Sequence, residues 1–383
     1  MIVGIVKETF PFERRVAMTP DVGAALGEVT LLLESGAGEA AGFPDAVYEA
    51  RGFEVVSDRK IVFERADVLL QVRTPGANLE AGAADLKHLK TGQILIGTAE
   101  SLITHDMIQT IAECGVVLFG MELMPRITRA QSMDVLSSRA TVSGYKASLL
   151  VAYELPKMFP LMMTTSGTVH PARVLVIGAG VAGLQAIATC RRLGAVVQAY
   201  DVRPSVKEQV ESLGANFVDL GLDMGEMEGA DGYARSQDED FYNRQREALA
   251  QVVSENDAVI TTASIPGKSS PLLITEEAVK TMPPGSVIVD LAAEQGGNCA
   301  LTRPDEAVVA FGVKILGPTN LPATAPYHAS QMYANNLANF FKLIFIDGQL
   351  EINLEDVIVR ETLVTQNGLV VNERVREAMK TES

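Results

Sequence analysis

The sequence predicts an α/β protein with two doubly wound, mostly parallel sheets. Two observations support this fold class. Short apolar runs alternate with segments of helical period along most of the chain, as expected when helices connect parallel strands. A glycine-rich turn of the kind that joins a strand to a helix lies near the middle of the chain, at residues 178–183. An α/β domain must therefore precede the turn, and a second one contains it.

In the part before the turn, five apolar runs are expected to be strands: Ile2–Val6, Val29–Glu34, Val68–Val72, Ile94–Gly97 and Val116–Phe119. Helices are expected between them at Pro20–Leu26, Asp45–Arg51 and Thr104–Cys114. The polar segment Glu122–Ser138 has no clear period, so we expect a long loop there, followed by a helix at Ala140–Leu155. Residues Pro160–Arg173 are expected to form a β-hairpin that leads into the turn.

The turn itself has the pattern of a dinucleotide-binding turn. An apolar run at Val174–Ile177 is followed by Gly178, Gly180 and Gly183, a helical segment and a second apolar run that ends in Asp201. The first glycine permits a tight turn, the second lets a pyrophosphate approach the backbone, and the third lets the helix lie close to the sheet. The helix N-terminus offers N–H groups to the phosphates.

Asp201 follows the turn at the spacing of an acid that binds the adenosine ribose, which favours NAD over NADP. Arg203, two residues later, would in another geometry pair with a 2′-phosphate. The candidate cofactor-binding residues in and around this motif also include Val181, Ala182, Val202, Ala263 and Ser264.

After Asp201 the α/β alternation resumes, with helices expected at Ser205–Leu213 and Thr275–Met282 and strands at Asn216–Asp219, Ala258–Ala263, Ser286–Leu291 and Val313–Leu316. A long helix is expected at Ser330–Ile346, followed by short strand-like pieces and a polar tail, and it is expected to return to the first domain. We therefore predict two Rossmann-like domains, the second inserted within the first: an N-terminal domain of residues 1–138 and 328–383, and an NAD-binding domain of residues 139–327.

The acidic, glycine-rich segment Leu220–Asp240 interrupts this pattern and is expected to be mobile. Tyr233, flanked by Gly232 and Ala234, would close over a bound ligand, or the segment is an inert insertion. The sequence leaves both interpretations open.

The amino-acid composition argues against several classes of function. The net charge of −16 argues against a nucleic-acid partner, which would require clustered Lys and Arg. The apolar runs are shorter than the roughly 20 residues that cross a bilayer, and no signal peptide is recognisable at the N-terminus, so a cytoplasmic chain without direct membrane insertion is expected. The three cysteines and four histidines are scattered, which makes a metal site unexpected.

Several motifs resemble one known family over essentially the whole chain. They are KETFPFERRVAMTP near the N-terminus, ELMPRITRAQSMDVLSS, the glycine turn with its helix, DGYA at 231–234, TTASIPGK at Thr261–Lys268 and VDLAAEQGGN at Val289–Asn298. Together they resemble the NAD(H)-binding component, domain I, of proton-translocating nicotinamide nucleotide transhydrogenase.

The resemblance implies a loop that holds the nicotinamide end of NAD(H). It implies that Gln131 bonds the nicotinamide ribose and is closest to the chemical step, that Arg126 and Asp134 shape the loop, and that Ser137 contacts the carboxamide. It also implies an NADP-binding partner domain (domain III), a transmembrane proton-channel component (domain II), a homodimer, and attachment to the inner face of the cell membrane through partner subunits. Hydride transfer between two nicotinamides needs no acid or base from the protein, only two rings held in position.

Two alternatives share the cofactor turn. Alanine dehydrogenase is related, and Arg15 and Arg73 lie where its substrate-binding pair is expected, but its catalytic histidine is replaced by Thr98 and the aspartate before Gln-Gly-Gly by Glu294. Arg15 is then expected to be structural or ion-paired. A non-catalytic NAD-binding redox sensor would not need the loop of Gln131.

Overall fold

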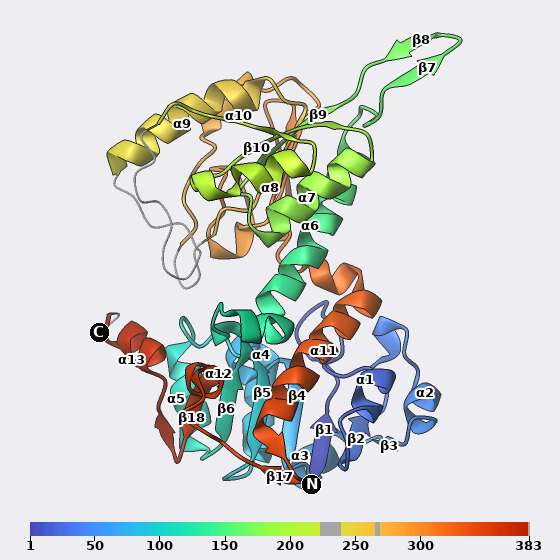
Figure 1. Ribbon diagram of the computed structural model, residues 1–383, viewed down its shortest axis with the longest axis vertical. Coiled ribbons are helices and arrows are strands. Elements are labelled where there is room, and N and C mark those ends of the chain that lie inside the picture. The colour runs from blue at the N-terminus through green and yellow to red at the C-terminus, as the bar shows by residue number, and fades with distance from the viewer. Residues whose placement is uncertain (223–238, 265–268, 382–383) are drawn as a thin grey trace. The chain divides into compact units, whose positions relative to one another are not determined.

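The computed structural model describes residues 1–222, 239–264 and 269–381. The chain divides into two compact units: unit 1, Met1–Arg139 with Pro322–Ser383, and unit 2, Ala140–Leu321. Unit 2 is thus one continuous segment between the two parts of unit 1 in the sequence. Each unit is built on a mostly parallel sheet with helices (Figure 1), so the predicted fold class is confirmed.

The sheet of unit 1 has the order β19-β18-β6-β5-β4-β1-β2-β3. Its parallel strands are β1 (Ile2–Ile5), β2 (Thr30–Glu34), β3 (Glu54–Val56), β4 (Val68–Arg73), β5 (Ile94–Thr98) and β6 (Val117–Gly120). Two antiparallel strands, β18 (Leu363–Gln366) and β19 (Leu369–Val370), extend it beyond β6. The five strands predicted here are present. The edge strand β3 was missed because it has only three residues and none of them is buried.

The helices of unit 1 come from both ends of the chain: α1 (Pro20–Ala24), α2 (Asp45–Glu49), α3 (Arg59–Arg65), α4 (Leu79–Gly82), α5 (His105–Glu113), α11 (Pro326–Ile344), α12 (Val357–Thr362) and α13 (Glu373–Thr381). Helix α11 buries Tyr333, Leu337 and Phe340 in the same core as strands β1, β4 and β6. The Phe340 ring lies 5.1 Å from that of Phe119. The helix predicted near the C-terminus thus packs in the first unit, and the predicted polar tail forms α13.

The sheet of unit 2 has the order β11-β10-β9-β12-β13-β15-β14. Its strands are β9 (Arg173–Ile177), β10 (Val196–Tyr200), β11 (Asn216–Phe217), β12 (Ala258–Thr261), β13 (Val287–Asp290), β14 (Ala307–Ala310) and β15 (Val313–Leu316). All pairs are parallel except β14 with β15. The antiparallel edge strand β14 was not predicted.

Four of the helices that the structure describes accompany this sheet: α7 (Val181–Arg192), α8 (Lys207–Ser212), α9 (Glu239–Ser254) and α10 (Glu276–Thr281). A fifth, α6 (Val135–Glu154), begins in unit 1 and continues into unit 2. Because α6 begins at Val135, the predicted loop Glu122–Ser138 ends earlier than expected. Its remaining part contains two 3-10 turns, η4 (Met121–Leu123) and η5 (Thr128–Met133).

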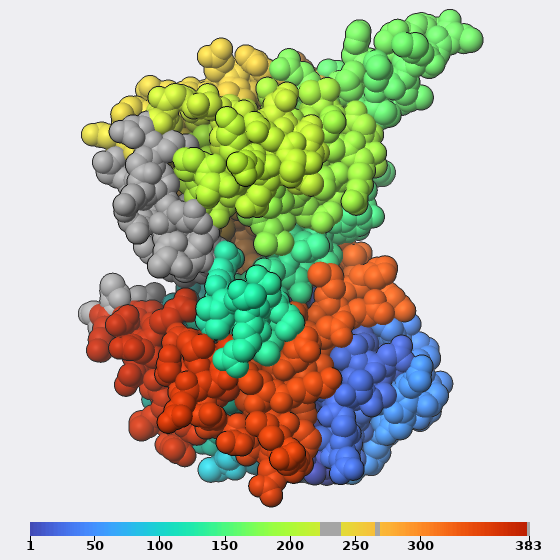
Figure 2. Space-filling view, in the orientation of Figure 1, coloured from blue at the N-terminus to red at the C-terminus, as the bar shows by residue number. Residues whose placement is uncertain are grey.

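The predicted hairpin precedes β9. Strands β7 (Met162–Thr164) and β8 (Gly167–Val169) pair antiparallel, with Met162 opposite Val169. Figure 2 shows the hairpin projecting from the body of unit 2, and the Met163 side chain is 84% exposed.

Residues 223–238, which include Tyr233, lie outside the described residues, so the predictions made for them stay predictions. Among the helices that the structure describes, none is long and apolar enough to cross a membrane. No group of three or more potential metal ligands occurs in the described part of the chain.

Candidate functional site

The strand order of unit 2 reverses direction between β9 and β12, since the chain proceeds from β9 to β10 and β11 on one side and from β12 to β13 on the other. Ligands of open α/β sheets bind beside the carboxyl ends of strands at such a point. Here β9 leads into Gly178 and β12 into Thr262, and the Thr262 hydroxyl donates to the Gly178 carbonyl at 3.0 Å. The glycine turn therefore lies at the switch point of its sheet.

Each glycine of the turn has a distinct geometry. Gly178 has a φ of +96°, and a Cβ there would lie 2.5 Å from the Thr262 hydroxyl oxygen. A Cβ on Gly183 would lie 1.8 Å from the Gly178 carbonyl oxygen, so helix α7 approaches the turn too closely for any side chain. A Cβ on Gly180 would meet no atom within 4 Å. The turn is thus closed on its sheet side and open at Gly180, where the pyrophosphate is expected.

Helix α7 begins at Val181 and Ala182, directly after this open position. Gly180 precedes the helix in extended conformation. The first N–H groups of a helix have no acceptor within it, and they carry part of the positive end of the helix dipole. The start of α7 therefore offers donors at the place where the sequence predicted phosphate binding.

Asp201 follows β10 and is 6% exposed. Its Oδ2 accepts from the Ala179 backbone N–H at 2.7 Å, so the carboxylate lies against the glycine turn. Arg203 contacts the same carboxylate through its backbone N–H (2.8 Å), Nε (3.0 Å) and Nη2 (3.0 Å). Val202, between them, is partly buried. A 2′-phosphate would have to draw Arg203 out of this pair.

Ala263 and Ser264 follow β12 on the other side of the switch point. Ala263 exchanges two hydrogen bonds with the side chain of Asn298, its N–H donating at 3.1 Å and its carbonyl accepting at 2.8 Å. The Ser264 hydroxyl donates to Gln295. Ala263 is thus held by Asn298, which ends the VDLAAEQGGN motif but was not among the predicted site residues.

The predicted nicotinamide loop lies in unit 1, and Asp134 shapes its end. Asp134 caps α6: its Oδ1 accepts from the Ser137 N–H at 3.0 Å, and its Oδ2 accepts from the Ser137 hydroxyl at 2.6 Å. Arg126 and Gln131 are exposed on the loop. Because the Ser137 hydroxyl donates its proton to Asp134, it would contact a ligand by accepting a hydrogen bond.

Residues from the C-terminal part of unit 1 hold this loop. Asn336 and Asn339 of α11 both donate to the Ser132 carbonyl, at 2.8 and 3.2 Å. Arg129 forms two hydrogen bonds of 2.7 Å with Asp356, and this contact lowers the pKa of the Asp356 carboxyl. Sequence reasoning missed these contacts because the partners lie more than 200 residues apart.

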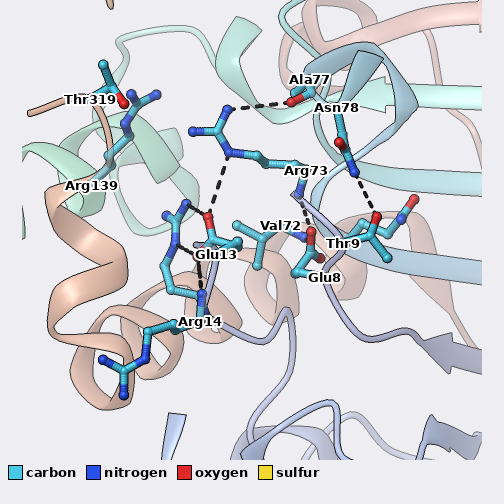
Figure 3. Close-up of polar contacts among 12 residues, drawn as sticks. Glu8, Thr9, Glu13, Arg14, Val72, Arg73, Ala77, Asn78, Arg139 and Thr319 are labelled. Atoms are coloured by element: carbon cyan, nitrogen blue, oxygen red, sulfur yellow. Dashed lines mark hydrogen bonds and ion pairs between the residues drawn. The ribbon is translucent and has the colours of Figure 1, made fainter. Parts of the chain in front are cut away.

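Unit 1 also contains a small pocket lined by Arg15, Arg73, Thr98 and Tyr333, among others. Its volume of about 10 Å³ is close to the minimum for one water molecule. The buried Glu13 carboxylate pairs with Arg15 at 2.7 Å. It also lies 3.7 Å from Arg73 (Figure 3). Arg15 is therefore ion-paired, as the sequence indicated.

The pocket lining offers no ordinary acid or base. Thr98 lines the pocket, and no histidine is among the lining residues that the structure describes. The Tyr333 hydroxyl donates to backbone carbonyls of Gln71 and Val72, and burial raises its pKa above the ordinary value. Amino-acid oxidation would require an acid or base beside the reacting carbon.

Beside the pocket, Glu8 accepts from the backbone N–H groups of Val72 at 2.6 Å and Arg73 at 3.1 Å (Figure 3). Burial, reinforced by the charge of Glu13, raises the pKa of Glu8 from 4.5 to about 8, although these two hydrogen bonds act to lower it. Between those two pKa values the folded chain binds a proton that the unfolded chain does not. The free energy of unfolding must therefore fall as pH rises between these two values, by up to about 1.4 kcal/mol per pH unit.

We expect Glu8→Gln to remove this dependence. Thermal unfolding of both proteins from pH 5 to pH 9 would show the wild-type unfolding temperature falling relative to the variant up to about pH 8 and running parallel above it. Parallel profiles throughout would contradict a raised pKa at Glu8.

Comparison with known proteins assigns the fold and the motifs to one family. The model "Alanine dehydrogenase/PNT, N-terminal domain" matches residues 4–143, and its C-terminal counterpart matches residues 147–373. The chain belongs to the alanine dehydrogenase/PNT family. The resemblance indicated by the motifs is therefore confirmed.

Within the alanine dehydrogenase/PNT family, the chain is 45% identical to the first part of NAD(P) transhydrogenase subunit alpha of Rhodospirillum rubrum, over 97% of this chain and 98% of the relative. It is 26% identical to alanine dehydrogenase of Bacillus subtilis, over 98% of this chain and 94% of that one. A crystal structure of transhydrogenase from Sinorhizobium meliloti superposes with a TM-score of 0.85 at 41% identity, covering 97% of this chain and 100% of that chain. An L-alanine dehydrogenase structure shares the fold, with a TM-score of 0.82 at 24% identity over the full length of both chains.

Proposed function

We propose that this chain binds NADH and passes its hydride directly to NADP⁺ held by a partner domain, as part of a proton-translocating transhydrogenase. The observation that carries the proposal is the pocket lined by Arg15 and Arg73, whose described lining includes Thr98 and no histidine that could act as the acid–base residue of amino-acid oxidation. The high identity to transhydrogenase alpha subunits supports the same reaction.

In this proposal, separate groups of residues bind the two ends of the cofactor. In unit 2, the open position at Gly180 and the start of α7 bind the pyrophosphate, and Asp201 accepts from the adenosine ribose. In unit 1, Gln131 orients the nicotinamide ribose, Arg126 and Asp134 keep the loop in shape, and Ser137 contacts the carboxamide. When bound, the nicotinamide supplies the hydride. The residues of the chain therefore need only bind and orient the cofactor and exclude water from the site.

The partners follow from the reaction. Hydride acceptance requires an NADP-binding domain, domain III, and coupling to proton movement requires a transmembrane component, domain II. We propose that this chain forms a homodimer, with the exposed β7–β8 hairpin in the interface, and attaches to the inner face of the cell membrane through those partners. The relatives from Rhodospirillum rubrum and Rickettsia prowazekii are named as the first part of an alpha subunit, which is consistent with further parts of an assembly.

A two-part assay tests the proposal. The purified chain is mixed with NADH, an NADP-binding transhydrogenase domain and NADP⁺, and separately with NAD⁺ and L-alanine. We expect NADPH formation in the first mixture, dependent on both proteins, and no NADH formation in the second. Alanine oxidation without transhydrogenation would favour the alanine dehydrogenase alternative. NADH binding with neither reaction would favour a redox sensor.

A further inference from the structure

Asn298 is a fully buried amide that joins two backbone segments of unit 2. Its side-chain Nδ2 donates to the carbonyls of Ala263 and Pro271, both at 2.8 Å, and its Oδ1 accepts from the Ala263 N–H at 3.1 Å. Both of its N–H donors are thus used, and it pairs with Ala263 as a neighbouring strand would. Residues 265–268, between the two segments, lie outside the described residues.

Asn298 is itself fixed by Asp290, the last residue of β13. The Asp290 Oδ2 accepts from the Asn298 N–H at 2.7 Å, the Cys299 N–H at 3.1 Å and the Thr302 hydroxyl at 2.7 Å. Its Oδ1 accepts from the Thr261 hydroxyl at 2.8 Å and the Ala292 N–H at 3.0 Å. These five donors offset the cost of burying the carboxylate, so the backbone at Asn298 has a well-defined position.

The segment that Asn298 holds is packed against the glycine turn. Thr262, directly before Ala263, donates to the Gly178 carbonyl at 3.0 Å. A Cβ on Gly178 would lie 3.1 Å from the Ala263 nitrogen. With so little space between them, a shift of Ala263 displaces the turn as well.

We propose that Asn298 is a positioning residue of the dinucleotide site. It acts through Ala263 and Thr262, which it holds against the glycine turn so that the two sides of the switch point keep the spacing that the cofactor needs. The proposal rests on the proposed NADH binding and adds a residue to it. Loss of the amide donors relaxes this spacing and weakens cofactor binding more than a comparable loss elsewhere in the sheet.

Asn256 provides a matched control. It is also fully buried in unit 2, and its Nδ2 also makes two bonds, to the Val252 carbonyl at 2.8 Å and the Gln198 side chain at 2.9 Å. It precedes the amino end of β12, whereas the glycine turn lies at the carboxyl ends of the strands. Asn298→Asp and Asn256→Asp each remove two donors and keep the side-chain size.

We expect both variants to lower the unfolding temperature by similar amounts. NADH fluorescence titration should give a dissociation constant about tenfold higher for Asn298→Asp, because Ala263 is no longer held against the glycine turn, and less than about twofold higher for Asn256→Asp. In the transhydrogenation assay, the KM for NADH should rise in Asn298→Asp while kcat at saturating NADH changes less than about twofold. If a buried carboxylate prevents folding, Asn298→Ala and Asn256→Ala serve as the second pair.

The outcomes are distinguishable. If the wild-type chain binds NADH and the Asn298 variants bind it equally well, the positioning role is wrong and the proposed function stands. Equal weakening by the Asn256 variants would likewise overturn it, since the effect would then be general destabilisation. Failure of the folded wild-type chain to bind NADH would overturn the proposed function and the positioning role together.

Discussion

Replacing Asp201 with alanine should weaken NADH binding by roughly 10- to 100-fold. The carboxylate lies against the glycine turn through its bond from the Ala179 N–H, and we propose that it accepts the ribose hydroxyls from there. Hydrogen bonds to a charged group contribute about 1.5–3 kcal/mol each, and about 1.4 kcal/mol corresponds to a factor of ten. The loss of this one acceptor is therefore expected to dominate the change in affinity.

The same substitution should move the preference toward NADPH. In the structure the Arg203 guanidinium is paired with Asp201 through Nε and Nη2, both at 3.0 Å. Without Asp201 these two hydrogen bonds are lost, so the guanidinium becomes better able to pair with a 2′-phosphate. In this proposal the carboxylate favours NADH in two ways: it accepts hydrogen bonds from the ribose, and it holds Arg203 away from a 2′-phosphate.

Dissociation constants for NADH and NADPH, measured by fluorescence for the wild type, Asp201→Ala and the double variant Asp201→Ala with Arg203→Ala, separate these two effects. NADPH binding gained in the single variant should disappear in the double variant, while NADH binding stays weak in both. An unchanged ratio of the two constants in Asp201→Ala would show that this carboxylate does not bind the ribose. Unfolding temperatures of the three proteins control for loss of the Ala179 contact.

The glycine turn could be predicted because its determinants are local. The positive φ of Gly178 and the 1.8 Å approach that excludes a side chain at Gly183 both arise within six residues of chain, and the strand before and helix after them are set by apolar runs. The cap at Asp134 was local as well. Asp134 directly precedes the apolar pair Val135 and Leu136, which is a helix start signal, and its side chain accepts from the Ser137 N–H. This signal in the sequence marks the start of α6, although the predicted loop continues to Ser138.

The supports of the site could not be predicted in this way. Asn298 contacts Ala263 across 35 residues, and Asp356 contacts Arg129 across 227. Pairings of this kind depend on which strands become neighbours and how long each loop is. A single sequence indicates which residues have donors and acceptors, but only the folded chain determines which of them meet.

Shortening Gln131 to asparagine should slow hydride transfer by about 100-fold and change NADH affinity less than about threefold. The substitution keeps the amide and withdraws it by one methylene. The loop cannot follow, since Asn336 and Asn339 hold the Ser132 carbonyl and Asp356 holds Arg129. A misplacement of about 1 Å in a positioning group costs up to 10²-fold in rate, whereas binding energy is spread over the whole dinucleotide.

Single-turnover mixing of the NADH-loaded chain with an NADP⁺-loaded partner domain measures the transfer step, and fluorescence titration measures affinity. Gln349→Asn is the matched control, because Gln349 is also an exposed glutamine of unit 1 but lies in β17 (Gln349–Leu350), away from the loop. It should leave both quantities unchanged. A loss shared equally between rate and affinity in Gln131→Asn would mean that Gln131 stabilises bound NADH and its transition state alike. Gln131 would then be a binding residue, and the orientation of the nicotinamide would have to come from elsewhere on the loop.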